Sequence, residues 1–107
     1  MPGLQRFSRT NQRRFRRAMI PQTTLLRCTG GEFRGRIRVL GEGGMFVDTI
    51  HPRTIGTEFD VTIEAGEPII ARCISRDVEP GWGMGVEFVQ LREPERARIR
   101  ELVSRYL

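Results

Sequence analysis

The stretch 38-RVLGEGGMFVD-48 reads as two apolar segments joined by a glycine-rich turn. Glycines between β-branched and aromatic residues are typical of a tight hairpin connection, because glycine accepts backbone conformations that other residues avoid. Turns of this kind recur at ligand sites, yet Val39 and Gly41 offer no polar side chain to a ligand. The stretch therefore predicts a β-hairpin, and raises the question of whether it is a working site or only the scaffold of one.

Apolar residues alternate with other residues on both sides of this hairpin. In the segment 33–39 one face is predicted to hold Phe33, Gly35, Ile37 and Val39, and the other Arg34, Arg36 and Arg38. In the segment 82–88 one face is predicted to hold Trp82, Met84, Val86 and Phe88. Further strands are predicted at 23–28, 45–50, 59–64 and 69–78. Six short strands joined by Gly/Pro turns predict an all-β fold, an antiparallel barrel or sandwich.

The period of the apolar residues changes near the end of the chain. Pro94 suits the first turn of a helix. After it, apolar residues recur at helical spacing, at Ile99, Leu102, Val103 and Tyr106. This pattern predicts a short C-terminal α-helix whose single apolar stripe packs on a mouth or flank of the barrel.

Length and composition exclude several classes of protein. The chain of 107 residues suits one domain with a modest core, and its apolar content of 38% is too high for a disordered chain. No apolar run approaches the roughly 20 residues of a transmembrane helix, and the first residues lack the apolar stretch of a secretory signal. We therefore expect a cytoplasmic protein without membrane insertion.

The sequence offers no clear pattern for catalysis or metal binding. Its serines lie in no nucleophile elbow and its glycine clusters form neither GxGxxG nor a P-loop, so we predict that it is not an enzyme. Cys28 and Cys73 are expected to be small buried side chains in a reduced compartment. With His51 as the only histidine, no metal site and no resident cofactor are predicted.

The positive charge is concentrated at the start of the chain. All 18 basic residues are arginines, and six of them lie in the first 17 residues: Arg6, Arg9, Arg13, Arg14, Arg16 and Arg17. The remaining 12 arginines face 13 acidic residues, which gives the rest of the chain a net charge of −1. We therefore divide the chain into a flexible arginine-rich arm at 1–20, which would meet an anion or only aid solubility, and a single folded domain at 21–107.

Three features together resemble the PilZ domain family. They are the RxxxR spacing within 13-RRFRR-17, the glycine-rich turn of VLGEGGMFV, and the strand reading GMGVEF near the end. The resemblance covers nearly the whole chain and implies a six-stranded antiparallel barrel with a C-terminal α-helix. It also implies a role in bacterial signalling, since many such domains are cyclic di-GMP receptors that control motility or biofilm formation through protein partners.

The resemblance implies a ligand site in two parts, of which one is incomplete here. Arg13 and Arg17 match the two arginines of RxxxR, whose guanidinium groups can bind phosphate and guanine, and Arg14 and Arg16 add positive charge. The second motif, [D/N]xSxxG, falls on Val39, Gly41 and Gly44, of which only Gly44 matches. Glu42 and Asp48 are nearby carboxylates at positions that the motif leaves unspecified.

The two mismatches have an expected cost. A desolvated base edge that loses its hydrogen-bond partner costs about 1–3 kcal/mol per group. Two such losses amount to roughly 2–6 kcal/mol, against about 8 kcal/mol for a whole micromolar complex. We therefore expect cyclic di-GMP to bind weakly or not at all, unless water or Glu42 replaces the missing side chains.

Three functions follow from this reading. The first is a regulatory adaptor that acts through an unidentified signalling or motility protein, with the arginines at 34, 36 and 38 as one candidate contact surface. The second is a genuine cyclic di-GMP receptor whose arm closes Arg13 and Arg17 over the ligand. The third, ranked below both, is a nucleic-acid binder that uses the arginine arm for phosphate contacts.

Overall fold

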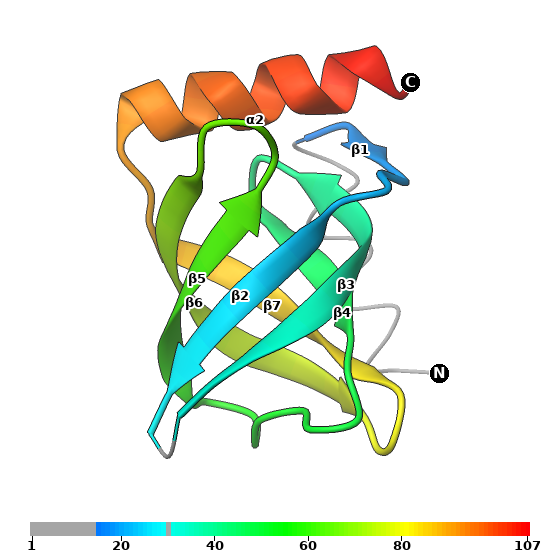
Figure 1. The fold of residues 1–107 in the computed structure, drawn as a ribbon, viewed down its shortest axis with the longest axis vertical. Helices are drawn as coiled ribbons and strands as arrows, with labels where there is room; N and C mark the ends of the chain where they lie inside the picture. Colours follow the sequence, from blue (N-terminus) through cyan, green and yellow to red (C-terminus); the bar gives the residue numbers. More distant parts are fainter. Residues whose placement is uncertain (1–14, 30) are drawn as a thin grey trace.

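The computed structural model describes residues 15–29 and 31–107. Within them the chain forms seven strands and one helix (Figure 1). These are β1 (Arg17–Ala18), β2 (Thr23–Cys28), β3 (Gly31–Gly41), β4 (Gly44–Asp48), β5 (Glu58–Glu64), β6 (Ile69–Glu79), β7 (Gly83–Gln90) and α2 (Glu93–Arg105). All strand pairings are antiparallel.

The six longer strands close into a barrel. Their order is β3-β2-β5-β6-β7-β4, and an additional pairing of β3 with β4 joins the two ends of the sheet. Closure leaves no free edge along the ring, which removes the unpaired backbone groups that an open sheet would expose. The predicted six-stranded antiparallel barrel with a C-terminal helix is therefore confirmed. The short β1 pairs with the end of β3, beside the helix (Figure 1).

One apolar core fills the barrel and continues to the helix. Its members are buried side chains from every strand and from α2, and the largest fully buried ones include Leu26, Ile37, Leu40, Met45, Ile63, Ile69, Met84 and Ile99. Inward residues recur at every second position in β5, as the alternation of apolar and polar residues predicted. Burying this apolar surface is the main source of stability, because each large side chain contributes about 1.5–3 kcal/mol on transfer from water.

Helix α2 closes one mouth of the barrel. Ile99, Leu102 and Val103 are buried, whereas Tyr106 lies just beyond the helix end and keeps 42% of its surface exposed. The predicted stripe was therefore wrong at Tyr106, because the helix ends one residue before it. Arg98 donates hydrogen bonds to the backbone carbonyls of Glu67 and Pro68, which ties the helix to the turn between β5 and β6. In the described part of the chain, no helix has both the length and the apolar character needed to cross a membrane.

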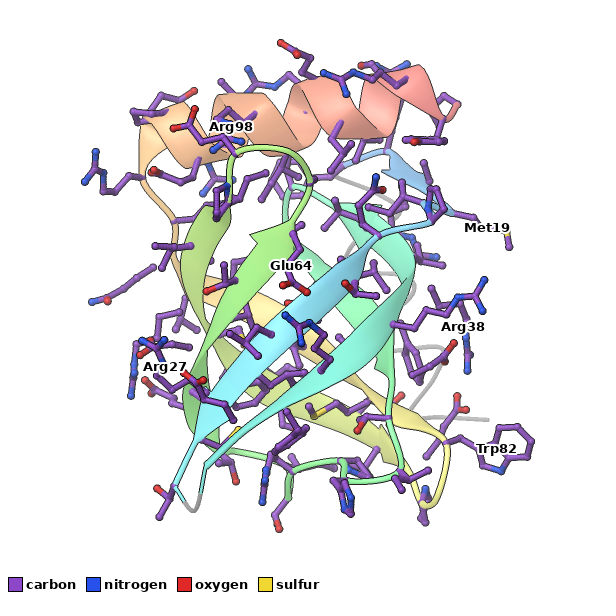
Figure 2. The ribbon with its side chains drawn as sticks, in the orientation of Figure 1. Met19, Arg27, Arg38, Glu64, Trp82 and Arg98 are labelled. Atoms are coloured by element: carbon purple, nitrogen blue, oxygen red, sulfur yellow. The ribbon has the colours of Figure 1, made fainter. Side chains whose placement is uncertain are left out.

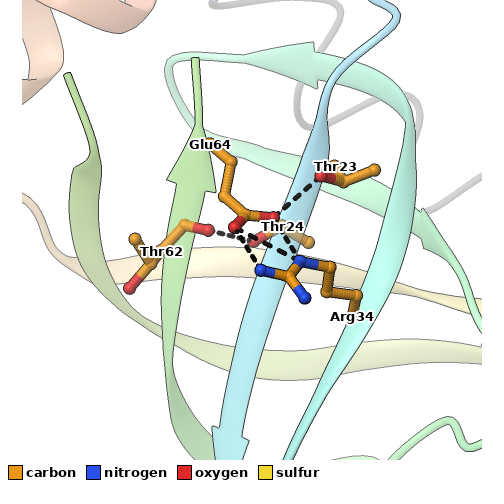
Figure 3. A network of polar contacts seen from close by, with 5 residues as sticks. All are labelled: Thr23, Thr24, Arg34, Thr62 and Glu64. Atoms are coloured by element: carbon orange, nitrogen blue, oxygen red, sulfur yellow. Dashed lines mark hydrogen bonds and ion pairs between the residues drawn. The ribbon is translucent and has the colours of Figure 1, made fainter. Parts of the chain in front are cut away.

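The outer face of the barrel carries a ladder of ion pairs. Figure 3 shows one of them, in which Arg34 on β3 meets Glu64 on β5, with Nε 3.0 Å from Oε1. Thr23 on β2 donates a hydrogen bond to the same carboxylate at 2.8 Å. The hydrogen bonds from Arg34 and Thr23 lower the pKa of Glu64. The hydrogen bond to Glu64 raises the pKa of Arg34. The side chains of Thr23, Arg34 and Glu64, at polar positions that alternate with the core, are thus satisfied by cross-strand partners.

Three sequence-based assignments of buried faces were wrong. The register of β3 against β4 shifts between Ile37 and Val39, and this irregularity turns Leu40 inward and leaves Val39 half-buried on the outside. Trp82 lies in the turn before β7 begins, so the alternation of that strand does not apply to it, and its side chain is 71% exposed. Cys28 is half-buried at the end of β2, whereas Cys73 is buried as expected.

Candidate functional site

The glycine-rich stretch forms the tight hairpin that the sequence predicted. Gly41 at the end of β3 pairs with Gly44 at the start of β4, so the connection consists of Glu42 and Gly43 alone. The carbonyl of Gly43 accepts a hydrogen bond from the backbone of Phe88 at 3.0 Å, which fixes the turn against β7. The hairpin therefore holds the positions of the second motif on a rigid element.

The described end of the arm lies directly on this hairpin. Arg17 pairs with Gly41 and Ala18 pairs with Leu40, which makes β1 a short extra strand beside β3. A side chain at position 41 would have no room, because its Cβ would lie 2.9 Å from the carbonyl oxygen of Arg16 and 2.9 Å from Cγ of Arg17. Gly41 thus permits the close approach of the arm, in the place where the family motif has a hydroxyl group.

The arm and the hairpin enclose a shallow pocket of about 420 Å³. It brings together Arg17 and Val39, two of the residues that the sequence analysis selected, and also Arg16. The same pocket is lined by residues that sequence reasoning missed, namely Phe15, Ala18, Met19 and Leu107. Nothing in the local sequence points to Leu107, because the fold alone brings the end of the chain to this place. Arg13 and Arg14 lie outside the described residues.

The carboxylate of Glu42 binds the helix and does not line the pocket. The carboxylate receives two hydrogen bonds from Arg100 of α2, at 3.1 Å from Nε and 3.0 Å from Nη2. These hydrogen bonds raise the pKa of Arg100 above its ordinary value. Only 16% of the Glu42 side chain is exposed, so this carboxylate is committed to the helix and is poorly placed to replace a missing ligand group.

Asp48 is also engaged. It forms an ion pair with Arg38 across β3 and β4, and the Arg38 guanidinium carbon lies 4.4 Å from the centre of the Phe46 ring. Both carboxylates near the second motif are therefore already bound to arginines of the chain itself.

Gly44, the one residue that matches the second motif, has a structural reason to be glycine. A Cβ atom at this position would lie 2.1 Å from the carbonyl oxygen of Val86 on β7. The backbones of β4 and β7 are paired here, Gly44 with Glu87, and leave no space for a methyl group. The match at Gly44 is thus explained by barrel closure without any ligand.

No cluster suited to a metal ion is found within residues 15–29 and 31–107, where no three or more His, Cys, Asp or Glu side chains gather. Burial raises the pKa of the Cys73 thiol far above its ordinary value. That thiol donates a hydrogen bond to the carbonyl of Phe59 at 3.5 Å, and is held in the uncharged form that does not react as a nucleophile.

Comparison with known proteins decides the family. The sequence model of the PilZ domain matches residues 11–105. The chain belongs to the PilZ domain family. The resemblance drawn from the arginine pair, the glycine-rich turn and the last strand is therefore confirmed for the family, and the binding roles of individual residues stay predictions.

Solved structures show the same fold in other PilZ proteins. The inhibitor of motility MotI/DgrA from Bacillus subtilis superposes with a TM-score of 0.73 at 15% identity, over 89% of this chain and 51% of its own. YcgR from Escherichia coli, in complex with c-di-GMP, superposes with a TM-score of 0.73 at 13% identity, over 89% of this chain and 46% of YcgR. The PilZ domain of YcgR from Escherichia coli with c-di-GMP superposes with a TM-score of 0.65 at 16% identity, over 90% of this chain and 92% of that domain. This chain thus spans about half the length of the first two proteins. No curated protein matches it in sequence.

One variant tests whether Gly41 holds the arm. Gly41→Ser would place a Cβ against the backbone of Arg16, so β1 should separate from β3. A loss of about 1–2 kcal/mol of local stability would expose the arm about tenfold more often. We expect trypsin to cleave after Arg17 about tenfold faster, as followed by mass spectrometry. Val89→Ser, at an exposed position of β7, should cleave at the wild-type rate. Equal rates for all three proteins would show that the arm does not depend on the glycine.

Proposed function

We propose that this PilZ domain is a regulatory adaptor that acts through protein contacts and binds cyclic di-GMP weakly. The observation that carries the proposal is the pairing of the arm with Gly41. In this arrangement the backbone carbonyl of Arg16 and the side chain of Arg17 take the space where the family motif has a side chain. At position 41 the arm therefore fills the space in which a side-chain oxygen could otherwise accept a hydrogen bond from guanine.

The surrounding residues support the same proposal. Val39 faces the pocket with an aliphatic side chain, and Glu42 is held by Arg100. Among the described residues, Arg16 and Arg17 form no ion pair, so they remain available to an anion. The pocket offers cations without a group that recognises guanine, which supports weak binding of a phosphate-bearing ligand rather than tight and specific binding.

The fold relatives make cyclic di-GMP the ligand to test. YcgR is solved in complex with it, and MotI/DgrA is described as an inhibitor of motility. Their likeness to this chain is a likeness of fold, so ligand and pathway enter here as parts of the proposal. A genuine receptor that grips the ligand with Arg13 and Arg17 is the competing function.

Calorimetric titration with cyclic di-GMP separates the two functions. For the wild-type protein we expect a dissociation constant of about tens of micromolar or weaker. Val39→Asn should tighten binding by about 5- to 150-fold, because an amide in the pocket would supply about 1–3 kcal/mol of recognition. Ile70→Asn makes the same kind of change at an exposed position of β6, away from the pocket, and should leave the affinity unchanged.

The role of the arm in binding cyclic di-GMP is tested in the Val39→Asn variant. Adding Arg17→Ala to Val39→Asn should remove most of the gained affinity, since the guanidinium group is expected to pair with phosphate. Wild-type binding at low micromolar concentration or tighter would contradict the adaptor proposal and establish the receptor. An unchanged affinity in Val39→Asn would show that the mismatch at this position does not limit binding.

A further inference from the structure

A second groove lies on the same outer side of the barrel, toward the opposite end from the helix. It measures about 500 Å³ and is lined by the outer residues of β3, the end of β4 and the turn that leads into β7. Its members are Arg36, Arg38, Asp48, Ile50, Gly81 and Trp82, together with Thr49. The described residues at positions matched to the two motifs, Arg17, Val39, Gly41 and Gly44, do not line it.

The backbone of Trp82 is fixed within its turn by two hydrogen bonds. The carbonyl of Trp82 accepts a hydrogen bond from the Thr49 amide at 2.8 Å, and its amide donates to the Glu79 carbonyl at 2.9 Å. The side chain is nevertheless 71% exposed, and Ile50 beside it is 75% exposed. Figure 2 shows Trp82 extending away from the barrel on the side that also carries Arg38. A large aromatic side chain on a fixed turn loses little conformational entropy when a partner covers it.

Arg36 is the cation of this groove that has no carboxylate partner within the described part of the chain. Its neighbours along β3 are both paired, Arg34 with Glu64 and Arg38 with Asp48. The same holds on β6, where Arg72 and Arg76 meet acidic partners on β5 and β7. Among the described residues Arg36 forms no ion pair or side-chain hydrogen bond. The ladder of ion pairs on the barrel surface is thus interrupted beside the exposed Trp82.

We propose that this groove docks an acidic segment of a partner protein, with a carboxylate on Arg36 and an apolar side chain against Trp82 and Ile50. Tryptophan and arginine are the residues most enriched where binding energy concentrates in protein interfaces. Asp48, the acidic residue of the groove, is already neutralised by Arg38 and does not repel an incoming carboxylate. The proposal deepens the adaptor function and rests on it, because it names the surface that the partner would use.

Charge and shape favour a protein segment over a nucleic acid here. Binding of a single strand depends on several cations along the backbone and on aromatic residues that stack successive bases. The groove offers a single indole. Within the described part of the chain, it also offers a single arginine that has no carboxylate partner. This arrangement suits one carboxylate next to one apolar anchor.

The only tryptophan of the chain lies in the groove, so fluorescence reports on the site directly. The probe is a fluorescein-labelled acidic peptide in which leucines alternate with pairs of glutamates. Its control has glutamine at every glutamate. Anisotropy of the label measures affinity, and an unlabelled copy of the peptide should shift the Trp82 emission to shorter wavelength as the indole loses water. Both titrations are run without cyclic di-GMP, so that they test the docking surface independently of ligand binding.

The variants have matched controls on the same strand. Arg36→Gln should weaken binding of the acidic peptide about tenfold, whereas Arg34→Gln, which removes a paired arginine, should leave it unchanged. Trp82→Ala should weaken it by about 30-fold in the anisotropy measurement. Binding of the glutamine peptide with equal affinity, or equal loss in the two arginine variants, would overturn the proposal.

Other occupants of the groove give distinct results. An emission shift that grows with protein concentration alone would mean that a second copy of the chain covers the groove. A larger shift with an oligothymidylate than with the acidic peptide would mean a nucleic-acid site. No shift with any probe would reject the docking surface, while the calorimetry described above would still decide the adaptor proposal on its own data.

Discussion

Gly44→Ala is expected to lower the melting temperature of this domain by about 12 °C or more. The added methyl carbon would lie 2.1 Å from the carbonyl oxygen of Val86, a distance that requires β4 and β7 to move apart. Overpacking costs about 1–3 kcal/mol where side chains can adjust. Here the obstacle is the backbone of a paired strand, so we expect the free energy of unfolding to fall by about 3 kcal/mol or more. That loss is a large part of the roughly 5–15 kcal/mol that stabilises a typical domain.

Gly66→Ala is the matched control for this substitution. Gly66 has a φ of +66° and open space around its Cβ position, so alanine there would strain the backbone without meeting another atom. We expect a loss of about 1–2 kcal/mol and a folded protein. Circular dichroism during thermal unfolding measures both variants. If Gly44→Ala were no less stable than Gly66→Ala, the tight approach of β4 to β7 would be contradicted, and the motif glycine would need a reason connected with ligand binding.

Ile99→Ala is expected to cost about 2–5 kcal/mol of unfolding free energy. Ile99 is fully buried on the face of α2 that covers the barrel mouth, within the same core as Leu40. Removing three carbon atoms there leaves a cavity that a rigid barrel cannot fill by collapsing. Urea unfolding followed by circular dichroism gives the free energy, and we expect little change in the slope with urea concentration.

The control for Ile99 lies on the exposed face of the same helix. Ser104→Ala keeps helix propensity at least as high and touches no core residue, so stability should stay within about 0.5 kcal/mol of the wild type. A loss for Ile99→Ala no larger than that of the control would mean that α2 packs only loosely on the barrel. The helix would then be free to move, and its contact between Arg100 and Glu42 would not hold the hairpin turn.

Most of the architecture could be predicted from the sequence because it depends on local patterns. Alternating residues in 59–64 and helical spacing around Ile99 indicate strands and a helix wherever they occur in a chain. Glycine and proline mark the turns for steric reasons that are equally local. These local patterns predicted the strands, the C-terminal helix and a barrel or sandwich. The choice of a closed six-stranded barrel came from the resemblance to the PilZ family.

The candidate site depended on contacts that no local pattern contains. The shift in register after Ile37 turns Val39 outward, and it arises in the pairing of β3 with its hairpin partner β4. Glu42 is bound by Arg100, a residue 58 positions away. Neither a spacing nor a charge in the sequence distinguishes this partner from the other arginines.

The sequence by itself thus determined the six longer strands, the helix, the glycine-rich hairpin and the missing side chains at Val39 and Gly41, but not the short β1 at Arg17–Ala18. Only the tertiary structure decided what covers Gly41, which carboxylates are already paired, and which arginine of β3 has no carboxylate partner among the described residues. The physical reason is that secondary structure follows from the period of residues along the chain. Pairing of charges and close approach of backbones follow from distances between segments, which are defined only once the barrel has closed.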